Sequence, residues 1–512
     1  MGRKRMTISL TANIVSYGTS ALVALVLTPF LVTRVGKEAY SFYPLANNFI
    51  LYIGILGIAL NSMAARFVTV AVVRGDTREA NAYFSSIFKV NLALALALVP
   101  VSTLFVANLQ HILTVPPNAL NEVRILFGLV LLAALIRIGA STLGIATFAS
   151  DRLDLRAATD IALSGVRVVA YLALFSILPP SIIYVGVVAA AVEVASLAMN
   201  WALTRKLLPR ITYFSAPFSL GAVRAVVTPG MWNAVRQVGA IMLSSLALLM
   251  CNVFLGPRAT GDFAIALTVP TFVAGLVAAV GAVFVPATTY RFALGVGPEL
   301  VHEVQRAQKI SGIISSVVIG IYVAVALDFF RLWVPSEDEE LLRALSILCV
   351  VHLVFTGATW PVSNLNISMN RVRVPALAMI VAGAVSVGLA FATLRFTDWG
   401  LVGLAASSLV PNLFLVLAFV PLYPCKELSL PRATFYPGIG VALLSFSLVF
   451  GCALALKSVV APTSWLGLAA VSLSAGCIGL LLSAMVAFGP KVIGEAARSI
   501  GARASGSGRL GT

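Results

Sequence analysis

The chain has 512 residues, of which 60% are hydrophobic and 11% are charged, and its mean hydropathy is +1.00. Soluble domains carry about 25% charged residues, so this composition excludes an ordinary soluble protein and is typical of a polytopic membrane protein. The formal net charge of +16 does not by itself indicate nucleic-acid binding, because membrane proteins concentrate Lys and Arg in their cytoplasmic loops.

Hydropathy predicts an all-α polytopic membrane protein with about 14 transmembrane helices, since each crossing needs ~20 apolar residues and only helices suit a chain this continuously apolar. The apolar segments cover residues 8–32, 43–63, 87–106, 123–148, 161–178, 182–203, 232–255, 263–285, 310–329, 342–365, 374–394, 401–423, 438–456 and 466–488. The first follows Arg3, Lys4 and Arg5 and is too long for the core of a signal peptide, so we expect a spanning helix there.

Loop charges predict the orientation. With the N-terminus inside, 23 Lys and Arg residues fall in cytoplasmic segments and 8 fall outside. The positive-inside rule therefore predicts that both termini are cytoplasmic, as an even number of helices requires.

Three short motifs recur at nearly one spacing. Phe30-Leu31 before Arg34 is repeated by Phe254-Leu255 before Arg258, Arg66-Phe67 by Arg291-Phe292, and residues 152–157 by residues 371–376. This common spacing predicts two six-helix lobes, residues 1–210 and 211–424, in a parallel pseudo-repeat. An additional helix pair over 425–490 and a cytoplasmic tail over 491–512 complete the predicted organisation.

Two charges are predicted to lie near mid-membrane. Arg137 shares a helical stripe with Ser141, and Glu193 shares another with Asn200. An arginine at the bilayer centre costs at least ~3 kcal/mol, so it usually faces a cavity or a partner. In one interpretation the two charges neutralise each other inside the N-terminal lobe and add little net stability. In the other, Arg137 binds an anionic substrate group and Glu193 is the ion-coupling carboxylate.

Further candidates for substrate binding are two arginines and several polar stripes. Arg167 and Arg236 lie close enough to predicted helix ends that they could also snorkel to the interface. The polar residues in the stripes pack helices together or line a cavity, and sequence alone leaves both open. They are Asn13, Tyr17, Asn48 and Gln237.

Signatures of soluble catalysis are absent from the sequence. It contains neither a phosphate-binding Gly-Lys-Ser/Thr loop nor a His-Glu-x-x-His zinc motif. The five cysteines lack paired spacing, which argues against disulfides or a metal site. We therefore expect a protein that is not an enzyme and that uses no cofactor and no metal.

Several motifs carry a family resemblance. They are Thr28-Pro29-Phe30-Leu31, Gly36-Lys37-Glu38-Ala39-Tyr40, Asn61-Ser62-Met63, Gly75-Asp76 and Arg152-Leu153-Asp154-Leu155. With them the chain resembles the polysaccharide/O-antigen lipid flippases of the polysaccharide transport family, within the multidrug/oligosaccharidyl-lipid/polysaccharide exporter superfamily. The resemblance implies two lobes that rock around a central cavity lined by helices one, two, seven and eight, in the bacterial cytoplasmic (inner) membrane. The partners it implies are a lipid-linked oligosaccharide, membrane lipids and polysaccharide polymerase or export proteins, with no nucleic acid.

The function that we expect is flipping of an anionic lipid-linked oligosaccharide, with an undecaprenyl-diphosphate glycan as the favoured substrate. A guanidinium supplies bidentate donors to phosphate oxygens that lysine cannot match. The alternative is an ion-coupled drug or metabolite antiporter of the same superfamily, although cationic drugs would require a more acidic cavity than Arg137, Arg167 and Arg236 against Glu193. A peptidoglycan-precursor flippase and a non-transporting scaffold form a third class.

Overall fold

The structure is a computed structural model that describes residues 3–214 and 216–489; the side chains of residues 3–17 and 20 lie outside the description. Every regular element in the described ranges is helical, as predicted. Two compact units divide the chain, Met1–Thr268 with Val372–Ser408 and Val269–Arg371 with Leu409–Thr512. The lobe boundaries predicted from the repeat stay a prediction, because compactness does not test an internal repeat.

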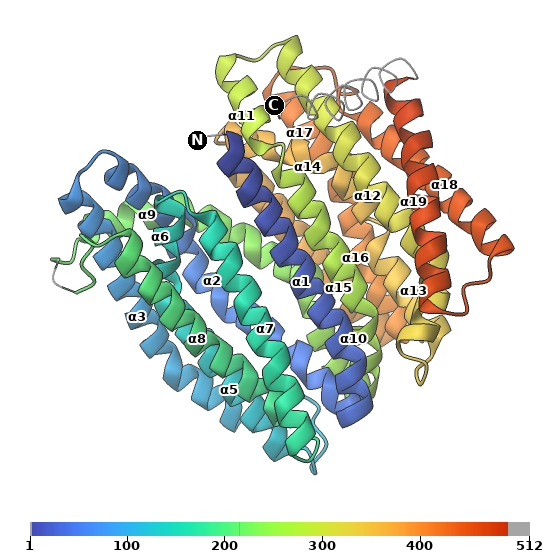
Figure 1. Cartoon of the computed structure of the whole chain (residues 1–512), viewed down its shortest axis with the longest axis horizontal. Coiled ribbons are helices and arrows are strands. Elements are labelled where there is room, and N and C mark those ends of the chain that lie inside the picture. Colours follow the sequence, from blue (N-terminus) through green and yellow to red (C-terminus); the bar gives the residue numbers. More distant parts are fainter. Residues whose placement is uncertain (1–2, 215, 490–512) are drawn as a thin grey trace, which may run out of the picture. The chain divides into compact units, whose positions relative to one another are not determined.

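Several of the long helices of the first unit run side by side (Figure 1). They are α1 (Arg3–Val35), α2 (Lys37–Val73), α3 (Thr77–Ala107), α4 (Leu109–Ile112), α5 (Leu120–Ala140), the 3-10 turn η1 (Ser141–Gly144), α6 (Ile145–Ala149), α7 (Leu153–Ile177), α8 (Ile183–Leu207), α9 (Leu220–Ala240), the π-helical turn η2 (Ile241–Ser245), most of α10 (Leu246–Ala282), α15 (Arg373–Phe396) and the first part of α16 (Gly400–Phe414).

The second unit contains the ends of α10 and α16 and the remaining helices. These are α11 (Val285–Leu294), α12 (Pro298–Trp333), α13 (Glu339–Val350), α14 (Leu353–Ser368), the π-helical turn η3 (Leu415–Phe419), α17 (Val420–Glu427), α18 (Tyr436–Val459) and α19 (Trp465–Phe488). The final pair, α18 and α19, packs against α12, where the Ser316 hydroxyl donates to the Ala442 carbonyl at 2.8 Å.

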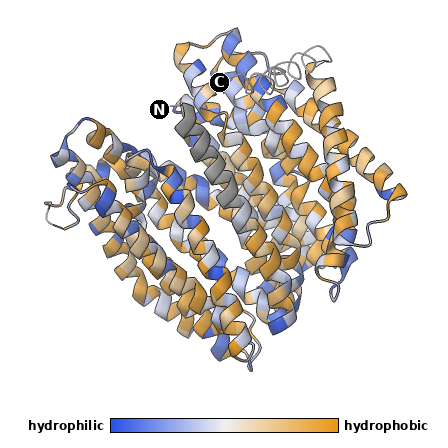
Figure 2. Cartoon of the chain, in the orientation of Figure 1, coloured by the Kyte–Doolittle hydropathy of each residue, from blue (hydrophilic) through white to orange (hydrophobic). Residues whose placement is uncertain are grey.

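Twelve helices among the described residues are long and apolar enough to span a membrane. Apolar residues cover most of their length, and hydrophilic residues gather at the ends and in the connecting loops (Figure 2). The expected count of about 14 differs from twelve in two places. The stretch Leu220–Leu294 has 75 residues, and Gly256 interrupts it with φ 84° and ψ 178°. A straight helix of this many residues would be about 110 Å long, several times the ~30 Å hydrocarbon core, so the broken stretch holds more than one crossing. The apolar part of α1 is described only from Ala21 to Val35.

Left-handed backbone positions recur at the spacing of the sequence repeat. The interval from Gly36 (φ 83°) to Gly256 (φ 84°) equals the interval from Gly75 (φ 74°) to Gly295 (φ 128°). Glycine suits these positions because a Cβ atom disfavours positive φ. The backbone therefore repeats its breaks as well as its motifs.

A third pair of turns repeats in hydrogen-bonding detail. Asp151 and Asn370 both have φ 55°, and almost the same interval of sequence separates them. Each is followed by an arginine whose amide closes the turn: Arg152 N–H donates to the Thr147 carbonyl at 2.8 Å, and Arg371 N–H donates to the Asn366 carbonyl at 2.9 Å. Asp and Asn are the side chains that best tolerate the left-handed region after glycine. Both turns close a spanning helix at the same numbered place in the repeat.

The apolar segment expected over 123–148 is confirmed as one span, Leu120–Ala149, although the 3-10 turn η1 separates α5 from α6 within it. Polar side chains explain the break. The Ser141 hydroxyl bonds back to the Ile138 carbonyl at 2.7 Å, and the Thr204 hydroxyl of α8 donates to the Leu143 carbonyl at 3.0 Å. Such partners compete with the helical ladder and satisfy the carbonyls that it releases. The break lies one turn beyond Arg137.

Candidate functional site

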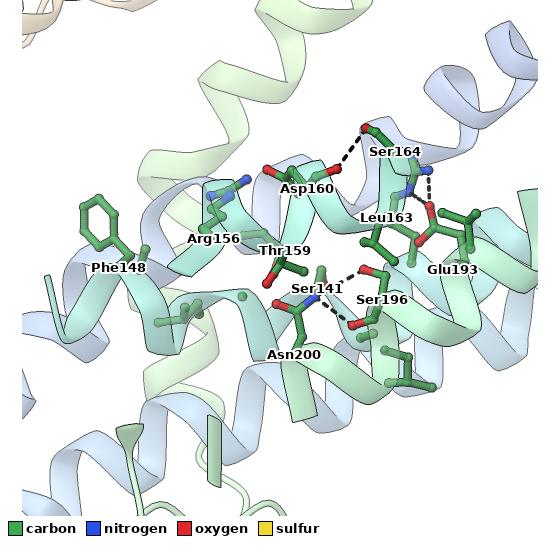
Figure 3. Close-up of a pocket in the computed structure, with 18 of the residues that line it drawn as sticks. Ser141, Phe148, Arg156, Thr159, Asp160, Leu163, Ser164, Glu193, Ser196 and Asn200 are labelled. Atoms are coloured by element: carbon green, nitrogen blue, oxygen red, sulfur yellow. Dashed lines mark hydrogen bonds and ion pairs between the residues drawn. The ribbon is translucent and has the colours of Figure 1, made fainter. Parts of the chain in front are cut away.

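A pocket of about 940 Å³ opens within the first unit and is walled by α2, α5, η1, α6, α7 and α8 (Figure 3). Its size is within the range of small-molecule sites. Five of the described residues that line it are ionisable, namely Arg137, Arg156, Asp160, Arg167 and Glu193. Polar uncharged residues fill much of the remaining wall, including Asn61, Ser141, Ser164, Ser196 and Asn200.

The Arg137–Glu193 pair joins α5 to α8 at this wall. Arg137 Nε donates to Glu193 Oε1 at 2.9 Å, and Nη2 contacts the same oxygen. The Arg137 side chain is 54% accessible and that of Glu193 is 13% accessible. The contact expected in the neutralising interpretation is therefore present. The accessible guanidinium has N–H donors beyond those two, so pairing with Glu193 does not close it to a second acceptor.

One face of α7 supplies the other charges. Arg156, Asp160, Ser164 and Arg167 follow at i, i+4, i+8 and i+11, and all four line the pocket. Figure 3 shows Arg156, Thr159 and Asp160 on the wall formed by α7, where the Ser164 hydroxyl donates to the Asp160 carbonyl at 2.9 Å. Our sequence interpretation singled out only Arg167 on this helix. The helical periodicity of the three charged residues is the signal that would have found Arg156 and Asp160.

A buried amide network lies behind the pocket wall. Asn61 of α2 and Asn91 of α3 exchange hydrogen bonds of 2.9 and 3.2 Å, and Asn91 also donates to the Thr142 hydroxyl of η1 at 2.9 Å. Asn91 and Thr142 are fully buried. The network fixes η1, and through it the last turn of α5 that carries Arg137.

The pocket carries a net positive charge, because its described lining has three arginines against two carboxylates. Arg137 lies in the last turn of α5, where the helix dipole favours a cation. A site with this balance attracts anions, and its serine and asparagine side chains offer both donors and acceptors to a polar ligand.

The other predicted site residues are not in this set. Asn48 Nδ2 donates to the Ser245 carbonyl at 3.1 Å, in the π-helical turn η2, so it joins α2 to the end of α9 within the first unit. Arg236 and Gln237 lie on α9, outside the described lining of the pocket. The side chains of Asn13 and Tyr17 lie outside the described residues.

Three of the arginines that recur in the repeat have acidic partners at helix ends. Arg152 pairs with Asp154 at 3.0 Å, Arg291 with Glu299 at 2.7 Å, and Arg371 with Glu427 at 3.4 Å. The ion pair with Asp154 raises the pKa of Arg152. Within the described part of the chain, no group of three or more His, Cys, Asp or Glu side chains could hold a metal ion.

Comparison with known proteins gives the fold. No protein-family model matches the chain. The uncharacterized membrane protein EpsK of Bacillus subtilis (strain 168) is 25% identical over 472 residues, which is 92% of this chain and 93% of that protein. The solved structure of the lipid II flippase MurJ in an inward closed conformation matches with a TM-score of 0.67 and 12% identity, covering 94% of this chain and 98% of that one. An inward-facing multidrug resistance MATE family transporter of the MOP superfamily matches with a TM-score of 0.61 and 16% identity, covering 80% and 94%. The chain has the fold that these two solved structures share.

Proposed function

We propose that this chain flips an anionic lipid-linked oligosaccharide across the cytoplasmic membrane of a bacterium by alternating access, with an undecaprenyl-diphosphate glycan as substrate. The observation that carries the proposal is the clustering of Arg137, Arg156 and Arg167 around one polar pocket in an otherwise apolar helical unit. The fold shared with a lipid II flippase supports it.

The chemistry of the pocket suits a sugar-diphosphate head group. Phosphate oxygens accept bidentate hydrogen bonds from guanidinium groups, and these charge-assisted bonds are strongest where water is sparse. Hydroxyl-rich sugars would bond to Ser141, Ser196 and Asn200, which line the same pocket. The lipid tail would stay in the bilayer while the head group crosses.

Glu193 has a defined place in this proposal. Its carboxylate pairs with the Arg137 guanidinium when no substrate is bound, and a substrate phosphate would compete for the same guanidinium. The displaced carboxylate is then free to take up a coupling ion. We therefore assign Arg137 to substrate binding and Glu193 to ion coupling, and no ATPase on this chain is required.

The experiment that tests the function uses a strain that lacks this chain. Lipids are extracted and polyprenyl-diphosphate oligosaccharides are quantified by mass spectrometry. We expect these lipids to accumulate in that strain. Expression of the wild-type chain or of Arg395→Ala should reverse the accumulation, whereas expression of Arg137→Ala should not. Arg395 is the matched control, because it is an exposed arginine in the last turn of α15. A strain without accumulation contradicts the proposal.

The second candidate is an ion-coupled drug or metabolite antiporter. It is favoured by the two carboxylates in the pocket, Asp160 and Glu193, and by the fold shared with a MATE transporter. Under this alternative the same strain would show no lipid intermediate and would be more sensitive to cationic drugs. Accumulation of lipid II in that strain would instead indicate a peptidoglycan-precursor flippase.

A further inference from the structure

A second cavity, of about 680 Å³, shares α5 and α8 with the pocket and differs from it in chemistry. It is a groove between α3, α5 and α8, and every described residue that lines it is apolar. Leu96, Leu132 and Val194, which are exposed, form part of its wall. Trp201 and Phe214 form one end.

The groove is separated from the polar pocket by the α5–α8 seam. Ala140 and Leu197 belong to the linings of both cavities, so the seam is about one residue thick. Elsewhere along the same seam, α5 and α8 pack closely at Gly186, where an added Cβ would lie 3.0 Å from Leu129 Cβ, and the Arg137–Glu193 pair joins the two helices. Because every described residue of the groove is apolar, the groove suits an acyl chain and not the polar head group that the pocket would hold.

The aromatic end of the groove is cationic. The Arg205 guanidinium stands over the Trp201 ring, 5.4 Å from its centroid. Lys89 lies next to Phe88 on α3 and donates to the Ala216 carbonyl at 2.7 Å, a partner that leaves its charge uncompensated. From residue 194 to residue 219 the sequence contains Arg205, Lys206 and Arg210 and no Asp or Glu.

The segment that connects α8 to α9 holds this end in place. Its Tyr213 ring stacks on Trp201 with centroids 4.6 Å apart. Asn81 Oδ1 accepts from the Thr212 amide at 2.7 Å, and Ser86 Oγ accepts from the Ser219 amide at 2.9 Å. The connecting segment is therefore tied to α3, and the aromatic and basic side chains keep fixed positions at the mouth of the groove.

We propose that this groove binds an anionic phospholipid, with an acyl chain along α3, α5 and α8 and the phosphate at Arg205 and Lys89. An apolar slot that ends in aromatic and basic side chains has the polarity of such a lipid, and basic sites between transmembrane helices on the cytoplasmic side bind anionic head groups. The positive-inside rule places this end at the cytoplasmic face. The bound lipid holds the connecting segment between the two halves of the chain, independently of what the pocket transports.

Native mass spectrometry of the full chain, purified with equal amounts of phosphatidylglycerol and phosphatidylcholine of identical acyl chains, tests the proposal. We expect one phosphatidylglycerol retained in preference to phosphatidylcholine. Arg205→Gln should weaken that retention about fivefold, as expected for one basic residue at an anionic lipid head. Arg432→Gln, an exposed arginine of the second unit, is the matched control and should retain the lipid.

Ala198→Phe fills the groove and should reduce retention of both lipids, since Ala198 lines it. Equal retention of the two lipids by the wild type, or unchanged retention in Arg205→Gln, would overturn the proposal. Because Arg205 is exposed, that variant folds even if Ala198→Phe does not. Binding of inorganic phosphate by the wild type but not by Arg205→Gln, without retention of phosphatidylglycerol, would show that the site takes free phosphate and would also overturn the proposal.

Discussion

Removing the two members of the Arg137–Glu193 pair should have different effects: loss of Arg137 should lower transport, whereas loss of Glu193 should preserve substrate binding and alter the pH dependence. The pair itself contributes less than ~1 kcal/mol to stability, because the Arg137 side chain is more than half accessible and solvent screens it. Its hydrogen bonds to a bound phosphate are worth about 1.5–3 kcal/mol. Arg137→Gln should therefore lower transport of a polyprenyl-diphosphate sugar about 10- to 100-fold while membrane levels of the protein stay normal.

Glu193→Gln leaves Arg137 free and raises the net charge of the pocket by one, so substrate binding should be unchanged or tighter. The double variant keeps the wild-type net charge and should behave like Arg137→Gln. The assay is uptake of a fluorescent polyprenyl-diphosphate disaccharide into proteoliposomes, with protein levels measured in parallel. Measured across pH, Glu193→Gln should also lose the pH dependence of transport, since that carboxylate is the candidate coupling group.

Comparison of the two single variants with the double variant distinguishes a role of Arg137 in substrate binding from a purely structural role of the Arg137–Glu193 pair. If both single variants lose protein and transport together, and the double variant restores both, Arg137 and Glu193 only hold α5 to α8. That result would refute the assignment of Arg137 to substrate. An unchanged pH profile in Glu193→Gln would leave the carboxylate as a partner of Arg137 without a coupling role.

Three further predictions concern the scaffold. Asn91→Leu should destabilise the protein by about 1–3 kcal/mol, because the buried Thr142 hydroxyl and the partly buried Asn61 amide both lose this partner, and a lowered Tm checks this. Gly230→Ala should lower the folded yield, since its Cβ would lie 2.1 Å from a carbonyl oxygen of α2, whereas Gly54→Ala meets no atom within 4 Å and should be harmless. Asp151→Val and Asn370→Val should each cost roughly 1–2 kcal/mol at the same left-handed turn. Very different costs at these two sites would contradict their equivalence.

The fold class was predictable because it depends on signals that are long and local. Runs of ~20 apolar residues and the asymmetry of loop charges need no knowledge of tertiary contacts. The 3-10 turn η1 was not predictable in this way. It depends on Thr204 of α8 reaching the Leu143 carbonyl, a contact between residues 61 positions apart. Helix ends and breaks of this kind are decided by neighbours that a hydropathy window does not contain.

The candidate site was predictable only in part, for a related reason. Arg137 and Glu193 were found because each is an isolated charge in an apolar run, and their contact is in the structure. Arg156 and Asp160 were overlooked because they lie near the start of α7, where charges are usually anchors at the interface. Only the shape of the pocket shows that they face the same space as Arg167. The sequence made Arg236 as good a candidate for substrate binding as Arg167, but Arg236 lies outside the described lining of the pocket.

The backbone breaks recur in both halves of the chain, whereas the charges that line the pocket do not, and this difference bears on mechanism. Backbone breaks recur at one nearly constant interval, so the two halves share their turn chemistry. When the turn at Asp151 is aligned with the turn at Asn370, Pro375 and Ser386 stand where the first half has Arg156 and Arg167. Turn residues are duplicated because each half must fold, whereas binding charges are needed once. Under the proposed function, the anionic head group would therefore stay bound to the first half through the transport cycle, and substitutions that reverse charge in the second half should leave substrate affinity unchanged.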